Sequence, residues 1–145
     1  MPSKKKNSPS ALGFCTRGGG VHTARTLMLA ELSALLDAVP DPAAAREDYR
    51  KAVVEENCLG KATGRNRQIT FAHLATLYAL DPEVLLFRAL LHFWRQDPPG
   101  RALLALLCAY ARDPLLRQSA PVILSLREGE RITSADMAAF FARKH

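Results

Sequence analysis

The residues most suited to binding chemistry lie in one short stretch, from Glu55 to Arg67. The acidic pair Glu55-Glu56 is followed by a turn with two glycines, and three basic residues come within seven positions: Lys61, Arg65 and Arg67. Cations at this density can bind phosphate groups, which supply the sequence-independent part of DNA affinity. The alternative is a solvated turn with ordinary surface arginines, and the residue types alone leave both interpretations open.

The elements on either side of this stretch determine how it is presented. A helical pattern runs from Pro42 to about Glu56, and a second one covers Ile69 to Leu80. Two helices joined by a glycine-containing turn, with basic residues at the start of the second, form the outline of a helix-turn-helix element. We therefore expect such an element here.

The second helix has two candidate starting points. If it begins at Thr70, residues 61–67 form a basic loop; if it begins at Gly64, they belong largely to the helix. In the second case, one face is apolar and carries Phe71, Leu74 and Tyr78. The opposite face, where a DNA groove can be contacted, then carries Arg65, Gln68, Ala72 and Thr76. Either arrangement presents cations to phosphates.

Charge is distributed unevenly along the chain, which has a formal net charge of +6 over 145 residues. Residues 1–25 hold five basic residues and no acidic one, and residues 58–80 hold three basic residues and no acidic one. Between them, residues 26–57 hold seven acidic residues against three basic ones. This segregation favours a polyanion partner more strongly than the net charge does.

Composition predicts an all-α fold: a compact multi-helix domain of six to eight short helices. The apolar share is 48%, Leu, Ala and Arg dominate, and β-branched residues are few. Asp-Pro pairs at 41–42, 81–82 and 113–114 resemble helix starts, because Asp accepts hydrogen bonds from first-turn amides and Pro at the first position forfeits none. The helices are expected at 23–39 with Thr23 as cap, 42–56, 82–96, 100–112, 114–118, 121–127 and 134–143, in addition to the second helix described above. A capping box of Thr133 and Asp136 opens the last of them.

Helical spacing also predicts the core. The residues expected to be buried are Met28, Leu32, Leu35, Leu36, Val39, Ala45, Tyr49, Ala52, Val53, Leu85, Leu86, Leu90, Phe93 and Trp94. Phe87 is expected with Trp94 and Phe93 in the core rather than on a platform for stacking bases. The helix 100–112 is apolar almost all round, which predicts a central buried position.

The N-terminal residues have a different composition. Residues 1–22 are rich in Ser, Pro, Lys and Gly, which predicts a flexible basic leader before a single helical domain at 23–145. That domain is either complete or the N-terminal part of a longer architecture. Lys4, Lys5 and Lys6 are interpreted either as an arm that adds phosphate contacts or as a tail that aids solubility.

Motifs for catalysis, metal binding and membrane insertion are lacking. Cys15, Cys58 and Cys108 are widely spaced, which predicts reduced thiols in a cytoplasmic protein rather than a disulfide framework or zinc site. No H-E-x-x-H or G-x-S-x-G pattern occurs, and the longest apolar run, Ala102 to Ala111, is about half a bilayer span. We expect no enzymatic activity, no cofactor, no metal and no membrane span.

The run Val53-Val54-Glu55-Glu56-Asn57-Cys58-Leu59-Gly60-Lys61-Ala62-Thr63, continued through Arg65 and Arg67, resembles the BrxA family. These are small helical proteins of BREX-type bacterial phage-defence loci, and the resemblance covers roughly residues 23–80. It implies a winged-helix-like or related all-α DNA-binding protein without catalytic residues. By position, Lys61, Thr63, Arg65 and Arg67 would face the DNA.

Two functional hypotheses follow. The first is a noncatalytic protein that binds double-stranded DNA, with a phage-defence role implied by the resemblance and other defence proteins as partners. Its candidate nucleic-acid-binding residues are Lys61, Thr63, Arg65, Arg67, Gln68, Lys4, Lys5 and Lys6. The second is a protein–protein adaptor or complex subunit, because residues 84–126 hold more leucine than one seam can bury. Sequence specificity, DNA versus RNA and oligomeric state stay open.

Overall fold

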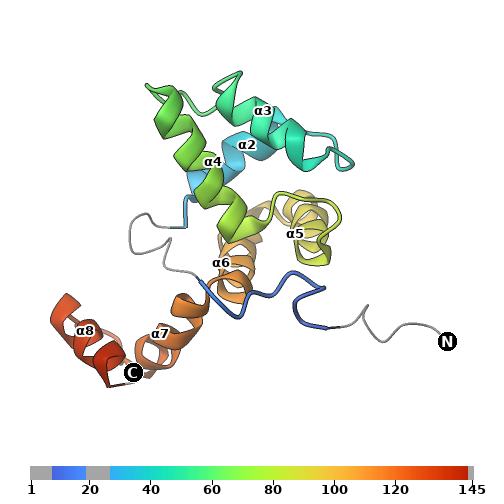
Figure 1. Ribbon diagram of the computed structural model, residues 1–145. Coiled ribbons are helices and arrows are strands. Elements are labelled where there is room, and N and C mark those ends of the chain that lie inside the picture. The colour runs from blue at the N-terminus through green and yellow to red at the C-terminus, as the bar shows by residue number, and fades with distance from the viewer. Residues whose placement is uncertain (1–7, 19–26, 144–145) are drawn as a thin grey trace.

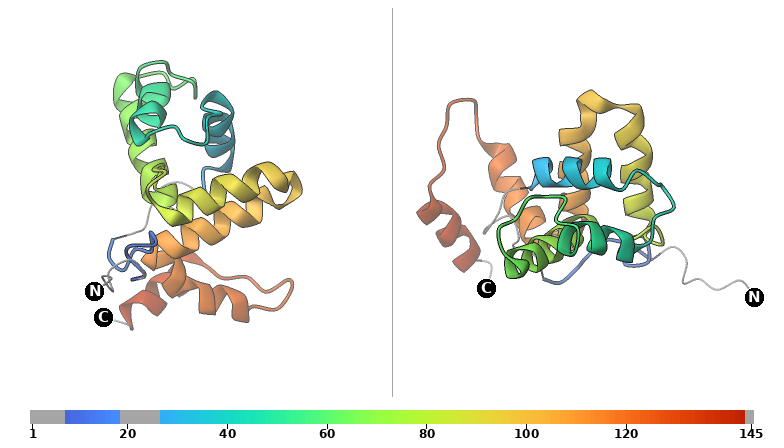
Figure 2. Two further views of the ribbon diagram at one scale, coloured as in Figure 1. Left: turned by 90° about the vertical axis from the view of Figure 1, so that its right-hand side faces the viewer. Right: turned by 90° about the horizontal axis from the view of Figure 1, so that it is seen from above.

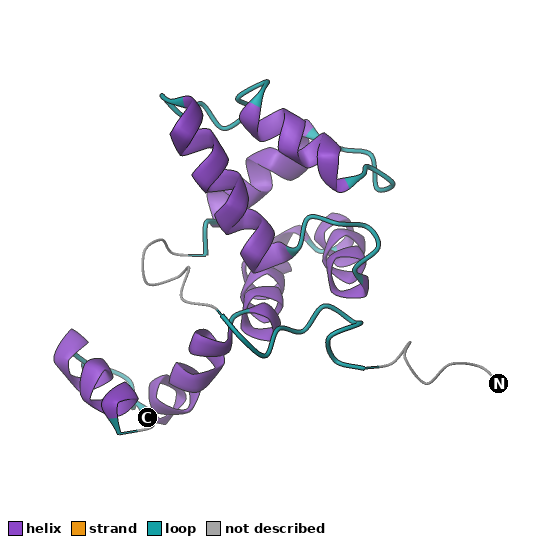
Figure 3. Cartoon of the chain, in the orientation of Figure 1, coloured by secondary structure: helices purple, strands orange, loops and turns teal. Residues whose placement is uncertain are grey.

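The computed structural model describes residues 8–18 and 27–143 (Figure 1). Within these ranges the chain forms helices and no strand, which confirms the all-α fold class (Figure 3). Thr23, the expected cap of the first helix, lies outside the described residues. The helices are α2 (Leu29–Ala38), α3 (Arg46–Val54), α4 (Gly64–Tyr78), α5 (Leu85–Gln96), the short 3-10 helix η2 (Pro98–Gly100), α6 (Arg101–Arg112), α7 (Pro114–Ser125) and α8 (Ser134–Ala142).

The helices form two packed groups that α4 joins. α3 packs against both α2 and α4, so these three helices lie together (Figure 1). α5 and α6 run side by side as an antiparallel pair, and α6 also packs against α4. α7 packs on α6, and α7 and α8 lie on the side of the α5–α6 pair that faces away from α3 (Figure 2). The C-terminal half of α4 is therefore the centre of the molecule.

The core contains most of the side chains that helical spacing predicted. α2 buries Leu32, Leu35 and Leu36, and α3 buries Tyr49 and Val53. These side chains meet the buried face of α4 and the aromatic rings of α5, and the rings of Tyr49 and Phe87 lie edge to face with centroids 5.5 Å apart. The apolar periodicity of this part of the chain is therefore that of helices around one core.

Two of the three Asp-Pro pairs do not begin helices, contrary to the prediction. Asp41 and Asp81 each accept a hydrogen bond from the backbone N–H two residues later, at 2.8 Å and 2.9 Å, and so cap a turn. α3 and α5 consequently begin several residues later, at Arg46 and Leu85. Asp113 behaves as predicted, because its carboxylate accepts from the N–H groups of residues 115 and 116 at the start of α7.

Three further helix boundaries can be compared with the prediction. α2 begins at Leu29 rather than Thr23, because Met28 has a left-handed backbone with φ 51°, which cannot continue a right-handed helix. α7 runs unbroken through Pro121, although a break before this proline was expected. A proline removes one intrahelical bond, but the other bonds of the helix persist across it. The predicted start of α8 is confirmed, with a reciprocal capping box of Thr133 and Asp136.

α6 is not the central buried helix that its composition predicted. It buries one face through Ala105, Cys108 and Ala109, whereas its leucines at 103, 106 and 107 are exposed. Three other expected core residues are also exposed: Ala45, Leu85 and Phe93. The bundle has too few helices to cover every apolar side of α5 and α6. No helix in the described part of the chain is long and apolar enough to cross a membrane.

The chain turns sharply at the buried C-terminal end of α4. Ala79 and Leu80 both have positive φ angles, 67° and 53°, and are almost fully buried. Three carbonyls at this end, those of residues 75, 76 and 79, accept hydrogen bonds from the guanidinium groups of Arg112 and Arg46. The Cys108 thiol donates to a fourth carbonyl, that of residue 77, at 3.8 Å. Side chains thus supply hydrogen-bond donors to the carbonyls at this helix end.

The buried groups at this joint predict a loss of stability at alkaline pH. Burial raises the pKa of the Cys108 thiol to about 12, although the charge of Arg112 lowers it in part. Burial also raises the pKa of Tyr78, whose hydroxyl donates to the Leu27 carbonyl. Ordinary thiols and phenols ionise near 9.0 and 10.0. The stability that Cys108 contributes is therefore complete below pH 9 and falls by about 1.4 kcal/mol per pH unit towards pH 12.

Urea denaturation of the native protein and of Cys108→Ala, between pH 7 and 11, measures this effect. The free energy of unfolding should decline above pH 9 in both proteins, but less steeply in the variant. Below pH 8 the difference between the two should be constant, because both carry protonated groups there. Parallel curves up to pH 11 would show that the Cys108 thiol titrates equally in the folded and unfolded chains.

Candidate functional site

The sequence left two starting points for the helix after the basic stretch, and the structure selects Gly64. Thr63 is the N-cap, and its hydroxyl oxygen accepts from the Asn66 N–H at 3.1 Å. Gly64 follows with no neighbouring heavy atom near the position of a Cβ, so close packing does not require a glycine there. Arg65 and Gln68 therefore lie within the first two turns of a 15-residue helix.

The connection between α3 and α4 is longer than the turn of a typical helix-turn-helix. It covers residues 55–63, whereas the motif usually has a turn of about three or four residues. Asn57 orders it by accepting from the Lys61 N–H at 2.7 Å, and the Cys58 N–H donates to the carbonyl of Ala52 at 2.9 Å. The two helices do pack against each other, but a helix-turn-helix in the strict sense remains a prediction.

α4 has the two faces expected for a start at Gly64. Leu74 and Tyr78 are fully buried, and Phe71 is half-buried. The opposite side is exposed and carries the four predicted residues, Arg65, Gln68, Ala72 and Thr76. We call these four residues the outer face of α4. It has no acidic residue, and its two small residues leave room for a partner to approach the helix backbone.

Lys61 is engaged within the protein. Its ammonium group lies 3.1 Å from the Glu31 carboxylate of α2, and both side chains are about one quarter exposed, at 22% and 27%. An ion pair with little solvent around it neutralises the lysine locally. Lys61 thus fixes the connection before α4 to α2, and its charge is less available to a phosphate than that of an unpaired lysine.

Arg67 is also directed inwards. Its Nη1 donates to the carbonyl of Val54, the last residue of α3, at 3.0 Å. Its Nε is buried and has no hydrogen-bond partner among the described residues. The guanidinium therefore caps the negative end of α3 and ties it to α4. Of the three basic residues in the 61–67 stretch, only Arg65 is exposed, and the other two are half-buried.

Lys4, Lys5 and Lys6 lie outside the described residues, so the structure does not relate them to the outer face of α4. Residues 12–15, which follow them, are held in place by hydrogen bonds. The Leu86 N–H donates to the carbonyl of Leu12 at 3.1 Å, and the Cys15 N–H donates to the carbonyl of Ala111 at 3.2 Å. This part of the expected leader is therefore fixed to α5 and α6.

Sequence reasoning did not identify a group of arginines next to the outer face of α4. A pocket of about 450 Å³ lies between residues 15–18 and the C-terminal half of α4, and it includes Arg17, Arg46 and Arg112 in its lining. Ala72 and Thr76 of the outer face also line it. These arginines are far apart in sequence, so no local motif predicts that they lie close together. We call this cavity the arginine pocket.

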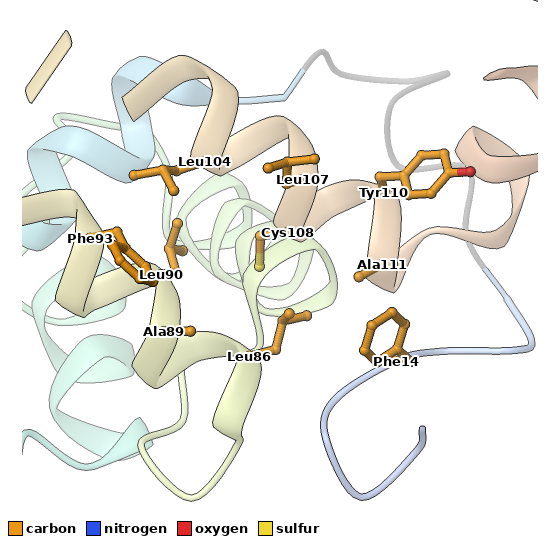
Figure 4. Close-up of a pocket in the computed structure, with 10 residues that line it drawn as sticks. All are labelled: Phe14, Leu86, Ala89, Leu90, Phe93, Leu104, Leu107, Cys108, Tyr110 and Ala111. Carbon is orange, nitrogen blue, oxygen red and sulfur yellow. The ribbon is translucent and has the colours of Figure 1, made fainter. Parts of the chain in front are cut away.

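A second surface is apolar. Leu103, Leu106, Leu107 and Tyr110 of α6 form an exposed ridge, and Leu103 and Leu107 are 59% and 56% exposed. On one side, a cavity of about 300 Å³ lies between α5 and α6, and Phe14 lines one end of it (Figure 4). On the other, a cavity of about 350 Å³ lies between α6 and α7. No charged residue lines either cavity. We call the ridge and its two cavities the α6 apolar face.

Within residues 8–18 and 27–143, no three His, Cys, Asp or Glu residues lie close enough together to hold a metal ion.

No protein-family model matches this sequence, and neither the curated proteins nor the solved structures include a significant match. Three surfaces are the candidates for binding a partner: the outer face of α4, the arginine pocket and the α6 apolar face.

The different environments of Arg65 and Arg67 predict different costs of removing them. Arg67→Ala should lower the free energy of unfolding by about 1–3 kcal/mol, because it removes a charge-assisted hydrogen bond from the end of α3. Arg65→Ala should change stability by less than about 0.5 kcal/mol, as is usual for exposed residues. Urea denaturation of the two single variants provides a matched comparison. Equal losses would show that Arg65 is also structural.

Proposed function

We propose that this protein binds double-stranded DNA without catalysing a reaction on it, and that the outer face of α4 is its main contact. The observation that carries the proposal is the arrangement of this face. Arg65 and Gln68 stand on an exposed, acid-free helix surface that leads to the arginine pocket. A basic, amphipathic surface with small residues suits a groove flanked by phosphates.

The geometry of α4 supports this role. A helix of 15 residues is about 22 Å long, and its width fits the major groove of B-DNA. Its N-terminal end lies at the edge of the molecule, away from α5 and α6 (Figure 1). Recognition helices contact base edges mainly through residues near their N-terminus, where helix N–H groups also favour phosphates. Arg65 and Gln68 occupy these positions.

Three of the other predicted residues would position the start of α4 instead of contacting DNA. Lys61 and Arg67 attach the start of α4 to α2 and α3, and Thr63 caps its first turn. They would hold Arg65 and Gln68 in place rather than contact DNA themselves. Lys4, Lys5 and Lys6 would add nonspecific phosphate contacts. The resemblance of residues 53–67 to the BrxA family supports a role in bacterial phage defence, with other defence proteins as partners.

Mobility-shift measurements on a DNA duplex at several salt concentrations test the proposal. Affinity should fall steeply as salt rises, because phosphate neutralisation releases counterions. Arg65→Ala with Gln68→Ala should weaken binding at least tenfold and reduce the salt slope by about one phosphate contact.

Arg131→Ala is the matched control for charge, because Arg131 is exposed on the connection between α7 and α8. It should bind almost as tightly as the native protein. No binding of the native protein at low salt would refute DNA binding. Unchanged affinity in the folded double variant would exclude the outer face of α4 as the contact surface.

A second candidate function, that of a protein–protein adaptor, is favoured by the α6 apolar face. Its exposed side chains belong to three helices and residue 14, and they enclose two cavities without charged residues. Contiguous apolar areas beyond a few hundred Å² are unusual on monomeric proteins and commonly mark contact surfaces. The α6 apolar face would then contact another protein of the same defence locus.

This role predicts that charge on the ridge abolishes complex formation. Leu103→Glu with Leu107→Glu should leave the fold intact, because both side chains already face solvent. The variant should no longer co-purify with proteins encoded at the same locus that the native protein retains. Leu29→Glu, at an exposed position of α2, is the matched control and should retain them. Equal retention by all three proteins would argue against the adaptor role.

A further inference from the structure

The arginine pocket has a lining suited to an anion. Its lining includes three arginines, Arg17, Arg46 and Arg112, together with Cys15, Thr76 and small residues, and it includes no acidic residue. The acidic residues next to its arginines in sequence, Glu47, Asp48 and Asp113, each bond to other groups. Asp113 accepts from the N–H groups of residues 115 and 116 at the start of α7. Glu47 pairs with Arg50 at 2.7 Å, and Asp48 accepts from the N–H of residue 45 at 2.8 Å.

The charge of this pocket exceeds what capping of α4 requires. Arg46 and Arg112 bond to carbonyls at the C-terminal end of α4, and such an end carries about half a negative charge. Three guanidinium groups bring three positive charges, because arginine stays protonated at all physiological pH values. The helix end therefore offsets only a small part of the positive charge, and an anion would offset the rest.

Two of the three guanidinium groups are already held in place. Arg112 donates to the carbonyls of residues 76, 75 and 13 at 3.0, 3.4 and 2.9 Å. Arg46 donates to the carbonyl of Ala79 at 2.7 Å and lies over the Phe71 ring, 5.6 Å from its centroid. A guanidinium has five N–H groups, so both arginines keep donors beyond these bonds. Fixed donors lose little entropy when they bind a ligand.

The opposite wall of the pocket is anchored as well. Gly13 has φ +106°, and a Cβ there would lie 2.5 Å from a Val84 methyl group, so only glycine allows this close approach. Arg117 donates to the carbonyl of Cys15, and the Cys15 N–H donates to that of Ala111. These contacts fix the backbone two residues before Arg17, which places a third cation at the pocket.

We infer that the arginine pocket binds a phosphoryl anion. Arginine forks bond two oxygens of a phosphate at once, which a spherical halide cannot exploit. The phosphate can belong to a DNA backbone, in which case the inference rests on the proposed function and adds an anchor at the far end of the outer face of α4. It can equally belong to free phosphate or a phosphorylated small molecule.

An NMR titration of the full chain with sodium phosphate, against sodium chloride at equal ionic strength, tests the inference. Phosphate should shift the amide signals of residues that line the pocket, among them Cys15, Gly18, Ala75 and Thr76, and chloride should not. Shifts spread over all basic surfaces, or the same shifts with chloride, would overturn it.

Two variants at exposed positions test the site without removing the arginines that cap α4. Arg17→Gln should weaken phosphate binding at least tenfold, and Ala72→Glu, which adds a carboxylate to the wall, should abolish it. Arg131→Gln and Ala138→Glu make the same changes elsewhere and should bind phosphate like the native chain. Undiminished phosphate binding in folded Arg17→Gln and Ala72→Glu would refute the pocket.

Competition identifies the source of the phosphate. A DNA duplex that displaces phosphate from the pocket supports a backbone phosphate as the natural ligand. Pyrophosphate that binds at least tenfold more tightly than phosphate, with no displacement by the duplex, supports a free phosphorylated ligand. Arg65→Ala with Gln68→Ala should keep its phosphate affinity in both cases. Loss of DNA binding with retained phosphate binding therefore bears on the outer face of α4 alone.

Discussion

The hydrogen bonds of Arg112 to the C-terminal end of α4 hold together three parts of the molecule that are distant in sequence. α4 ends in the middle of the molecule, where no further helical turn follows, and two buried residues with positive φ then redirect the chain. A buried carbonyl left without a hydrogen bond costs about 1–3 kcal/mol, which is a large share of the stability of a domain of this size. Arg112 bonds two of them as well as the carbonyl of Gly13, and Arg46 bonds a third. One guanidinium thereby joins α4, α6 and residues 12–15.

The arginines that bond to the end of α4 also determine the charge of the surface around it. Capping carbonyls with arginine rather than with neutral donors brings full positive charges to the rim of α4, next to its exposed and acid-free side. Some basic residues elsewhere are paired with carboxylates: Arg50 with Glu47 and Glu55, and Lys61 with Glu31. Arg65 and the arginine pocket, in contrast, place positive charge on and beside a helix face that has no acidic residue. This is why the proposed DNA contact and the inferred phosphate site share one helix.

The apolar surface has a different origin. α5 and α6 each have apolar residues on more than one side, but only one side of the pair packs against α4 and its neighbours. α7 covers part of α6, and α8 buries none of its residues, so the C-terminal helices add little to the core. A ridge of leucines is left between two uncharged cavities. Covering these apolar side chains with a partner would be favourable, because it removes them from water. The outer face of α4 is polar and basic, so it offers no comparable hydrophobic contribution.

The all-α class, most of the helices and, for a start at Gly64, the two faces of α4 were predictable from the sequence. Leu74 and Tyr78 follow helical spacing, and the capping box of Thr133 and Asp136 acts over three positions, so local physics suffices for them. The sequence could not decide which apolar residues are covered: Phe87 and Phe93 lie in the same largely apolar helix, yet other helices cover only Phe87. Nor could it separate Arg65 from Arg67, or bring Arg17, Arg46 and Arg112 together. Those outcomes depend on carbonyls and carboxylates that are 13 to 99 residues away in the chain. Only the tertiary structure places these groups within reach of each other.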